Sequence, residues 1–381
     1  MTRVVLTCLL FSGVLASGAQ AATYTGSKAC QTCHPAVYAR WQKTRMANIV
    51  RDPKGQPDII EGDFSKPNPL VTFKPADVDL VYGDKWKQRY FYKKGNDYFI
   101  YPVQWDVENK VWRPYHAAKG TDWWTARYPD ANSERPTGPL CDGCHSVNYN
   151  VSTHQPTEWN VGCEKCHGPG SDHVAKPAKS NIVNPSRLDR TRANDVCMQC
   201  HTQGQPLNNP IAADANRYYD WPVGFVAGQR LSDYWALEEH KLGETSFTHS
   251  PDGTAHKNRM QGNDFVQSEM YKHGITCFAC HDVHGTANNA DTIKTGNALC
   301  KTCHTDIDAA AHSHHAQGSV GAECTGCHMP KIEQTIAAVN VRAHTFRFAP
   351  SNCNVCHKEK DAAWTKQNLA KWTNFSVWRF E

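Results

Sequence analysis

The chain has 381 residues, of which 17 are Cys and 20 are His, and a single fold of ordinary composition rarely uses so much of either residue. Hydrophobic residues make up 40%, and 21 Pro and 25 Gly interrupt the chain, so composition argues against a domain held by a hydrophobic core alone and predicts staples or embedded cofactors. The formal net charge of +4 gives no indication of nucleic-acid binding.

The N-terminus has the pattern of a secretory signal peptide. Arg3 precedes an apolar run over residues 4–16, and Ala19-Gln20-Ala21 offers a small-x-small cleavage site. The run is shorter than the roughly 20 apolar residues that span a bilayer. We therefore expect residues 1–21 to be removed, and a periplasmic or secreted product without an integral membrane segment.

Loss of Cys8 with this segment leaves 16 cysteines in an oxidising compartment, where disulfides are the first expectation. Their spacing contradicts disulfides, because they form eight Cys-x-x-Cys pairs, each followed directly by His, with no Cys left over. The motifs are Cys30/Cys33/His34, Cys141/Cys144/His145, Cys163/Cys166/His167, Cys197/Cys200/His201, Cys277/Cys280/His281, Cys300/Cys303/His304, Cys324/Cys327/His328 and Cys353/Cys356/His357.

This spacing is typical of covalent haem attachment. Two thiols three residues apart lie about one helical turn from each other, so both can add to the vinyl groups of one haem while the adjacent imidazole binds its iron. One such motif alone could be a zinc site or a thiol redox pair. The complete set predicts eight covalently bound c-type haems, numbered here by their motifs.

The segment between the first two motifs is rich in aromatic and β-branched residues. Tyr90-Phe91-Tyr92 and Tyr98-Phe99-Ile100-Tyr101 flank a turn over residues 93–97. This pattern predicts a hairpin from Lys87 to Val103 within a small β subdomain over about residues 70–125. An aromatic binding surface is one interpretation, but we favour a core packed on haem 1.

The remaining motifs fall into two groups, which begin at Cys141 and at Cys277. We expect an N-terminal cluster of haems 1–4 over residues 22–270 and a C-terminal cluster of haems 5–8 over residues 271–381. A chain of 381 residues is too short to form a separate domain around each of eight haems. The expected fold is mainly α with much irregular chain, stacked haems and the small β-hairpin subdomain near the N-terminus.

The second axial ligand of each iron decides between a carrier and an enzyme, because a second His or a Met saturates the iron, whereas an open position admits a substrate. Subtracting the eight motif histidines from 20 leaves twelve. His284 is too close to His281 to reach the opposite face of the same haem, so it would serve a neighbouring haem. The preferred ligands are His173, His256, His273, His284, one of His314 and His315, and His344, ahead of His240, His249, His312, His116 and His154.

Haem 1 poses a separate question, because no spare His occurs between His34 and His116. Met46 follows His34 at a distance that one short helix could bridge, and its thioether could bind the iron. The alternative is that Met46 is a flexible apolar residue packed on the haem. A thioether ligand would raise the potential of haem 1 relative to two histidines.

Three stretches resemble the bacterial multihaem cytochromes c: Ala29 to His34 followed by Trp41, Glu164 to Gly170 followed by His173, and Cys277 to Gly285. That family includes the tetrahaem electron carrier of nitrifiers and octahaem oxidoreductases. The resemblance implies stacked haems with mostly bis-His ligation, but no particular substrate. Enzymatic members have a Lys-ligated haem or a late cross-linked Tyr, whereas here every motif ends in His and no Tyr follows Tyr271.

The sequence therefore predicts an octahaem c-type cytochrome for periplasmic or extracellular electron transfer. Its expected partners are redox proteins, either other cytochromes or a quinol-linked donor. The alternative is an octahaem oxidoreductase that acts on a small nitrogen or sulfur compound such as nitrite, hydroxylamine or tetrathionate.

Overall fold

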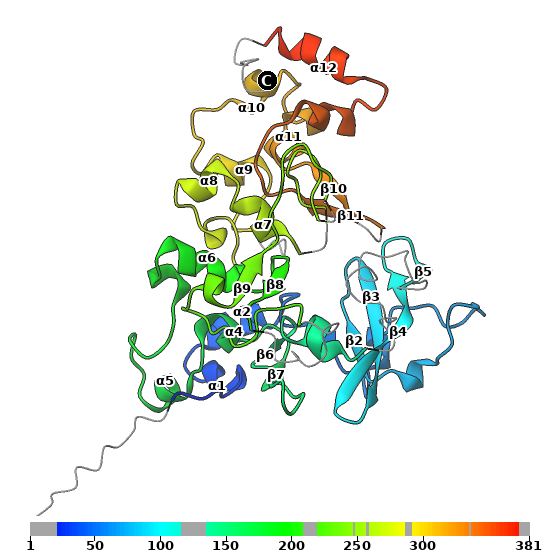
Figure 1. Cartoon of the computed structure of the whole chain (residues 1–381), viewed down its shortest axis with the longest axis vertical. Helices are drawn as coiled ribbons and strands as arrows, with labels where there is room; N and C mark the ends of the chain where they lie inside the picture. The colour runs from blue at the N-terminus through cyan, green and yellow to red at the C-terminus, as the bar shows by residue number, and fades with distance from the viewer. Residues whose placement is uncertain are drawn as a thin grey trace, which may run out of the picture.

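The computed structural model describes residues 21–115, 135–208, 219–246, 248–256, 259–285, 292–334 and 337–372. Residues 1–20 of the predicted signal peptide lie outside this description, as does His116. The molecule is elongated, with the N-terminal helices at one end and the last described helix at the other (Figure 1). Within the described part of the chain, no helix has both the length and the apolar character needed to cross a membrane.

A five-stranded antiparallel sheet forms in the segment between the first two motifs. Its order follows the chain: β1 (Val50–Arg51), β2 (Leu80–Tyr82), β3 (Lys87–Lys94), β4 (Asp97–Asp106) and β5 (Val111–Pro114). The predicted hairpin is confirmed, because β3 and β4 pair from Lys87 opposite Asp106 to Lys94 opposite Asp97. The turn contains Gly95 with a φ of +65°, a left-handed conformation that glycine adopts without a Cβ clash.

The two faces of this sheet carry different cores, because successive strand residues point to opposite sides. One face buries Tyr90, Trp105 and Trp112 under the loop that contains Phe64. The other buries Tyr82, Phe91 and Ile100 and contacts Cys141 and Trp159. The preferred interpretation of the aromatic residues as a core is confirmed, but these contacts join the sheet to the second motif rather than to the first.

Helices are short throughout the described chain. The α-helices are α1 (Lys28–Gln31), α2 (Pro35–Trp41), α4 (Cys163–His167), α5 (Ser171–Ala175), α6 (Arg190–Met198), α7 (Gln261–Phe265), α8 (Glu269–Lys272), α9 (Asn297–Cys300), α10 (Ala309–Ser313), α11 (Cys324–His328) and α12 (Ala362–Leu369). One π-helical turn, η4 (Gly138–Asp142), leads into the second motif. The 3-10 turns are η1 (Pro57–Ile59), η2 (Pro75–Asp77), η5 (Pro185–Arg187), η6 (Leu231–Asp233), η7 (Cys277–Ala279), η8 (Val320–Ala322) and η9 (Pro350–Val355).

The expectation of a mainly α fold is wrong. Helix accounts for 30% of the structure and strand for 15%, and the longest described helix, α6, has 9 residues against 10 in strand β4. The physical reason is that a Cys-x-x-Cys-His motif needs only one helical turn. Helices this short are unstable by themselves, so tertiary contacts must hold them.

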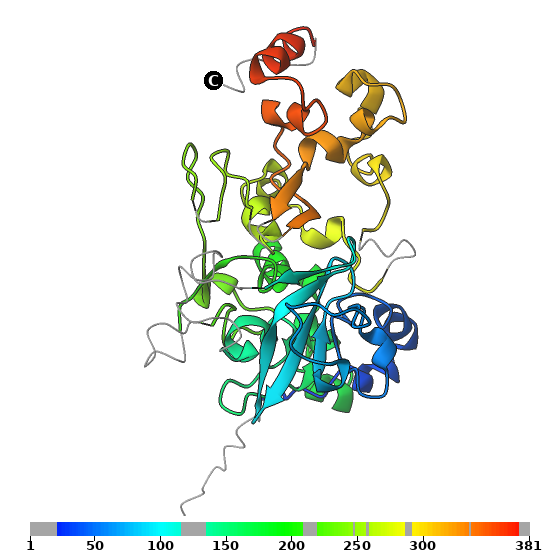
Figure 2. The ribbon, with the colours of Figure 1, turned by 90° about the vertical axis from the view of Figure 1, so that its right-hand side faces the viewer.

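Three two-stranded ribbons follow motif histidines. They are β6 (Ser146–Val147) with β7 (Glu158–Trp159), β8 (Gly204–Pro206) with β9 (Trp235–Leu237), and β10 (Lys331–Gln334) with β11 (Ala337–Arg342). The large sheet lies beside the part of the molecule that holds α1 to α6, while α7 to α12 continue away from it (Figures 1 and 2). The boundary near residue 270 between two haem clusters stays a prediction.

Candidate haem sites

Each motif forms a single turn that brings its two thiols to one side. In six motifs the backbone N–H of the His donates to the backbone carbonyl oxygen of the first Cys at 2.8–3.1 Å. The other two motifs lie within the one-turn helices α4 and α11. All 16 motif cysteines are free thiols. Both sulfurs of every motif are therefore available for thioether bonds.

Some of the predicted attachment residues are exposed to solvent rather than buried in a pocket of the chain. They are Cys33, Cys303 and Cys356 among the cysteines and, among the histidines, His34, His201, His304 and His357. The motif spacing predicts that these residues bind haem, which would cover them.

Five motif histidines face a second histidine ring at nearly constant separation. The rings are also close to parallel. The distances between ring centroids and the interplanar angles are 6.4 Å and 13° for His34 and His173, 6.1 Å and 16° for His167 and His284, 6.4 Å and 23° for His281 and His344, 6.2 Å and 21° for His328 and His312, and 6.2 Å and 37° for His357 and His315.

This separation fits one metal ion between two imidazoles. Two metal–imidazole bonds of about 2 Å, each extended by about 1.1 Å to the ring centre, place the centres about 6 Å apart. Rings in direct face contact lie much closer, as the 3.8 Å between Phe73 and Tyr101 in the same chain shows. The five pairs therefore have the spacing of bis-His ligation of a haem iron.

The second ring nitrogen of several paired histidines is already engaged. A metal-binding His usually gives its other N–H to a carbonyl or carboxylate oxygen, which fixes the tautomer and the ring orientation. Nδ1 lies at 2.6–3.4 Å from a backbone carbonyl oxygen in five of the ten rings: His173 with Ala178, His167 with Val183, His344 with Arg342, His315 with Ser313, and His328 with Phe346. Nε2 of these rings is then the nitrogen left for iron.

The motif histidines outside these five pairs are His145, His201 and His304. Nδ1 of the exposed His201 lies 3.3 Å from Oε1 of Gln261, the first residue of α7. The N–H of the exposed His304 donates to the Cys300 carbonyl oxygen at 3.0 Å, so its motif forms the same turn as the others. The ring geometry thus supports bis-His ligation at haems 1, 3, 5, 7 and 8, while the iron ligation by His145, His201 and His304 stays a prediction from motif spacing.

Family models match two parts of the chain. A model of the doubled CXXCH motif matches residues 270–309, and a model of cytochrome c554 and c-prime matches residues 106–168. This chain is a multihaem c-type cytochrome. Covalent binding of c-type haem through Cys-x-x-Cys-His motifs, which the spacing of the cysteines predicts, is therefore confirmed, while the number of haems stays a prediction.

The cytochrome also resembles individual proteins. The dissimilatory sulfite reductase MccA of Wolinella succinogenes is 22% identical over 400 residues, which cover 88% of this chain and 50% of MccA, so the chain spans about half the length of that relative. The crystal structure of the outer cell wall cytochrome OcwA matches with a TM-score of 0.72 and 22% identity, over 92% of this chain and 87% of OcwA. An undecahaem cytochrome from the S-layer of Carboxydothermus ferrireducens matches with a TM-score of 0.50 and 17% identity, over 92% of this chain and 60% of that cytochrome.

The predicted distal ligands have different positions in the cytochrome. Five of the candidate ligands each face a motif histidine. Four of them belong to the preferred set, namely His173, His284, His315 and His344, and the fifth is His312, which was expected with less preference. His284 faces His167 rather than its own neighbour His281, as expected from its short separation along the chain. His312 could have been found because it belongs to the cluster His312, His314 and His315 just before motif 7.

Other predicted ligands have other contacts. The ring of His314 stacks on Trp372 at 4.6 Å, and Nε2 of His256 lies 3.2 Å from the Ser246 carbonyl oxygen. The backbone N–H of His273, the C-terminal cap of α8, donates to the Glu269 carbonyl oxygen. Met46 accepts a hydrogen bond from the Val161 N–H through its carbonyl. The ring opposite His34 is His173, so the geometry favours His173 over Met46 at haem 1.

Direct contacts between motifs give their order in space. Cys163 N–H donates to Ser27, which precedes motif 1, and Cys277 N–H donates to Asn194, which precedes motif 4. Gln199 of motif 4 donates to Lys165 of motif 3. Motifs 1 and 3, 3 and 4, and 4 and 5 are therefore neighbours.

The second half continues in the same way. The N–H of Ile293, seven residues before motif 6, donates to the Cys280 carbonyl oxygen at 2.9 Å, which makes motifs 5 and 6 neighbours. Cys324 N–H donates to Asn297 before motif 6, and Asn352 before Cys353 donates to the Cys327 carbonyl at 2.6 Å. The motifs thus adjoin in the order 1, 3, 4, 5, 6, 7 and 8.

Motif 2 lies to the side of this series. Sγ of Cys144 lies 3.9 Å from the Gln199 carbonyl oxygen, and Sγ of Cys200 lies 3.9 Å from the Cys144 carbonyl oxygen. Lys165 Nζ donates to the Gly143 carbonyl oxygen at 2.5 Å. Motif 2 therefore contacts motifs 3 and 4 and forms a branch.

The surroundings of His145 in motif 2 differ from those of the five pairs. Its ring lies 5.2 Å from the ring of Tyr82 at 37°, and its buried Nδ1 has no hydrogen-bond partner. The Tyr82 hydroxyl donates to Asp142 at 2.7 Å, and Thr137 donates to the other carboxylate oxygen. Burial raises the pKa of Asp142 to about 6. The ring beside His145 is therefore that of a tyrosine from strand β2, at a shorter separation than in the five histidine pairs.

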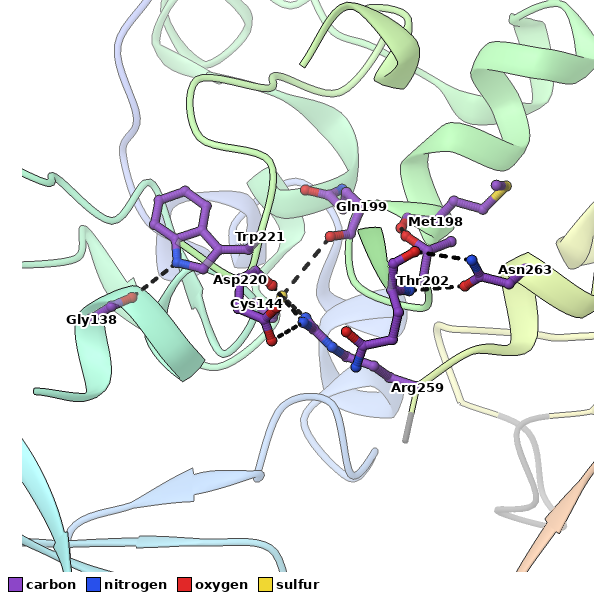
Figure 3. A network of polar contacts seen from close by, with 10 residues as sticks. Gly138, Cys144, Met198, Gln199, Thr202, Asp220, Trp221, Arg259 and Asn263 are labelled. Carbon is purple, nitrogen blue, oxygen red and sulfur yellow. Dashed lines mark hydrogen bonds and ion pairs between the residues drawn. The ribbon is translucent and has the colours of Figure 1, made fainter. Parts of the chain in front are cut away.

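Positive charge gathers around this motif. Arg259 forms an ion pair with Asp220 at 2.5 Å, and the Asp220 side chain is 2% exposed. Figure 3 shows the Arg259 guanidinium beside both Asp220 and Cys144, and it donates to Sγ of Cys144 at 3.2 Å. Burial and then Arg259, Arg89 and Lys165 lower the pKa of His145 to about 3. The site therefore favours a neutral imidazole and negatively charged ligands nearby.

Proposed function

We propose that this cytochrome carries eight haems and conducts electrons along its length. The observation that carries the proposal is the unbroken series of neighbouring motifs from motif 1 to motif 8. Each bound haem iron can accept and release one electron. Two cysteines would hold each haem, and at five sites the two facing histidines would both bind the iron, which is the ligation of electron-transfer haems.

We propose further that the protein works in the periplasm or outside the cell. The pattern of residues 1–21 supports export. Two structurally similar proteins are described as an outer cell wall cytochrome and an S-layer cytochrome, which supports an extracytoplasmic position. The proposed partners are other cytochromes or a quinol-linked donor that contact the two ends of the series.

The number of haems is tested by mass. Protein from a host with cytochrome c maturation should have the mass of the chain from about Ala22 plus eight haems. A fully matured sample with seven haems or fewer contradicts the count.

Conduction is tested by interrupting the series at two positions. Cys300→Ser with Cys303→Ser removes haem 6, which joins motif 5 to motif 7, whereas Cys141→Ser with Cys144→Ser removes haem 2, which is a branch. Mass spectrometry first confirms seven haems in both variants. Flash photoreduction should then show slow redistribution of electrons between the two halves of the haem 6 variant and normal redistribution in the haem 2 variant. Equal rates in the two variants contradict conduction along this series.

A second function has support at motif 2, namely the reduction or oxidation of a small nitrogen or sulfur compound. Tyr82 rather than a histidine lies near the ring of His145, and Arg259, Arg89 and Lys165 supply positive charge. The candidate substrates are nitrite, hydroxylamine and tetrathionate, together with sulfite because MccA is named a sulfite reductase.

Electron paramagnetic resonance of the oxidised protein separates the two functions. A carrier should have low-spin irons and leave all four compounds unchanged. A stoichiometric high-spin signal that shifts on addition of one compound, together with turnover, establishes the enzyme. The same signal should then disappear in the Cys141→Ser, Cys144→Ser variant.

A further inference from the structure

One contact between motifs occurs three times. A polar side chain three residues before the first Cys of one motif accepts a hydrogen bond from the backbone N–H of the first Cys of another motif. The contacts are Cys163 N–H to Ser27 Oγ at 2.8 Å, Cys277 N–H to Asn194 Oδ1 at 2.9 Å, and Cys324 N–H to Asn297 Oδ1 at 2.9 Å. They join motifs 1 and 3, 4 and 5, and 6 and 7.

Each of the two asparagines also makes a second hydrogen bond, to the segment just before its partner cysteine. Asn194 Nδ2 donates to the Ile275 carbonyl oxygen at 3.3 Å, and Asn297 Nδ2 donates to the Ala322 carbonyl oxygen at 2.8 Å. Both carbonyls stand two residues before the Cys that each asparagine binds. A carboxamide suits this position because it presents a donor and an acceptor side by side.

Ser27 achieves the same contact with support from a carboxylate. Its hydroxyl donates to Glu158 Oε1 and its N–H donates to Oε2, so the oxygen that accepts from Cys163 has a fixed direction. Ser27 is 2% exposed and Asn194 is 0% exposed. Away from water, loss of either side chain would leave a cysteine N–H without an acceptor, which is costly.

These contacts act on the haem attachment points themselves. Sγ of Cys277 also lies 3.2 Å from Asn194 Oδ1, so this asparagine contacts both the backbone and the side chain of the cysteine. Each clamp thus acts on the residue whose sulfur fixes one edge of a haem. The contact between motifs 2 and 4 differs, because there Sγ of the second cysteine, Cys200, lies 3.9 Å from the Cys144 carbonyl oxygen.

We propose that Ser27, Asn194 and Asn297 are positioning residues that set the separation and orientation of the two haem sites in each pair. The proposal rests on the proposed conduction along the motif series. Backbone clamps at the attachment cysteines restrict the two sites of a pair to one arrangement. That arrangement governs how strongly neighbouring irons interact and how quickly electrons pass between them.

Asn160 provides a matched control. It also stands three residues before a first Cys, Cys163, and it also makes a two-point contact, accepting from the Val50 N–H at 2.6 Å and donating to the Val50 carbonyl oxygen at 3.0 Å. Its partner is strand β1 rather than another motif. Asn160→Ala therefore removes an equivalent clamp without touching a haem pair.

The experiment compares Asn194→Ala and Asn297→Ala with Asn160→Ala in the fully loaded protein. All variants should retain the wild-type haem mass. Amide exchange at Cys277 should become roughly tenfold faster in Asn194→Ala, because one buried hydrogen bond is lost. The magnetic coupling of haems 4 and 5, seen by electron paramagnetic resonance, should weaken only in that variant, and Asn194→Asp, which keeps the acceptor oxygen, should restore it.

The outcomes separate this proposal from the function on which it rests. Faster amide exchange with unchanged coupling would show a merely structural clamp and overturn the proposal, as would equal loss of coupling in Asn160→Ala. If Asn194→Ala does not mature, Asn297→Ala and Ser27→Ala test the same effect at haems 6 and 7 and at haems 1 and 3. Failure of electron redistribution in the wild type would reject conduction, while the coupling would still report on the clamps.

Discussion

At the scale of single residues, the chain brings two imidazoles face to face at five of the eight haem motifs. The sequence allowed a prediction that His173 and His284 serve haems, and that His284 serves a neighbour of haem 5. It did not allow a choice of partner, because His34 and His173 approach only after motif 3 has folded back on motif 1. The cluster of His312, His314 and His315 indicates that a ligand lies there, but spacing alone does not tell which of the three rings reaches an iron, and the prediction favours His314 or His315 over His312.

Replacement of His173 tests the ligand of haem 1. In His173→Ala we expect one of the irons to lose its sixth ligand and to give a high-spin ferric signal. Met46→Ala should leave the low-spin spectrum unchanged, because the ring opposite His34 is His173. A long-wavelength sulfur-to-iron absorption band in the wild type that disappears in Met46→Ala would instead identify Met46 as the ligand.

The ion pair of Arg259 and Asp220 should contribute to stability through burial. Arg259→Met leaves the Asp220 carboxylate, 2% exposed, without its guanidinium, and removal of one partner from a buried pair costs roughly 3–5 kcal/mol. The exposed pair of Arg192 and Asp189 is the control, since Arg192→Ala should cost at most about 1 kcal/mol. Thermal unfolding followed by circular dichroism measures both, and equal midpoints would refute the expectation.

At the scale of elements, local pattern predicted the hairpin but not the balance of helix and strand. Alternating aromatic residues and the turn at Gly95 specify β3 and β4 through short-range geometry alone. The fold is not the mainly α fold expected, because each haem motif needs only one helical turn. The segments between motifs are held by side-chain to backbone contacts, such as those of Asn160 with Val50, which have no periodic signature.

The β-sheet should unfold without loss of haem. Trp112 is 7% exposed in the core of one sheet face and donates from Nε1 to the Asp63 carbonyl oxygen at 2.9 Å. Trp112→Ala should therefore cost about 3–5 kcal/mol, whereas Trp86→Ala, at a site 37% exposed, should cost much less. Chemical denaturation gives the difference. An unchanged haem mass in Trp112→Ala would show that attachment does not require the sheet.

At the scale of the whole molecule, the order of the motifs in space is not their order in the sequence. Motif 3 rather than motif 2 follows motif 1, and motif 2 branches from motifs 3 and 4. No spacing rule predicts this arrangement, since it depends on contacts such as that of Ser27 with Cys163, which join residues far apart in the chain. What spacing does predict is the set of attachment points, because that chemistry is local.

The same network predicts how the protein fills with electrons. Neighbouring irons repel each other's added charge, and two unit charges about 10 Å apart interact by about 1.7 kcal/mol at an effective dielectric constant of about 20. Motif 4 contacts motifs 2, 3 and 5, whereas the described contacts of motif 8 lead to motif 7. Removal of haem 4 should therefore narrow the span of potentials more than removal of haem 8. Spectroelectrochemical titration of the Cys197→Ser, Cys200→Ser and Cys353→Ser, Cys356→Ser variants measures both spans, and equal narrowing would contradict this network.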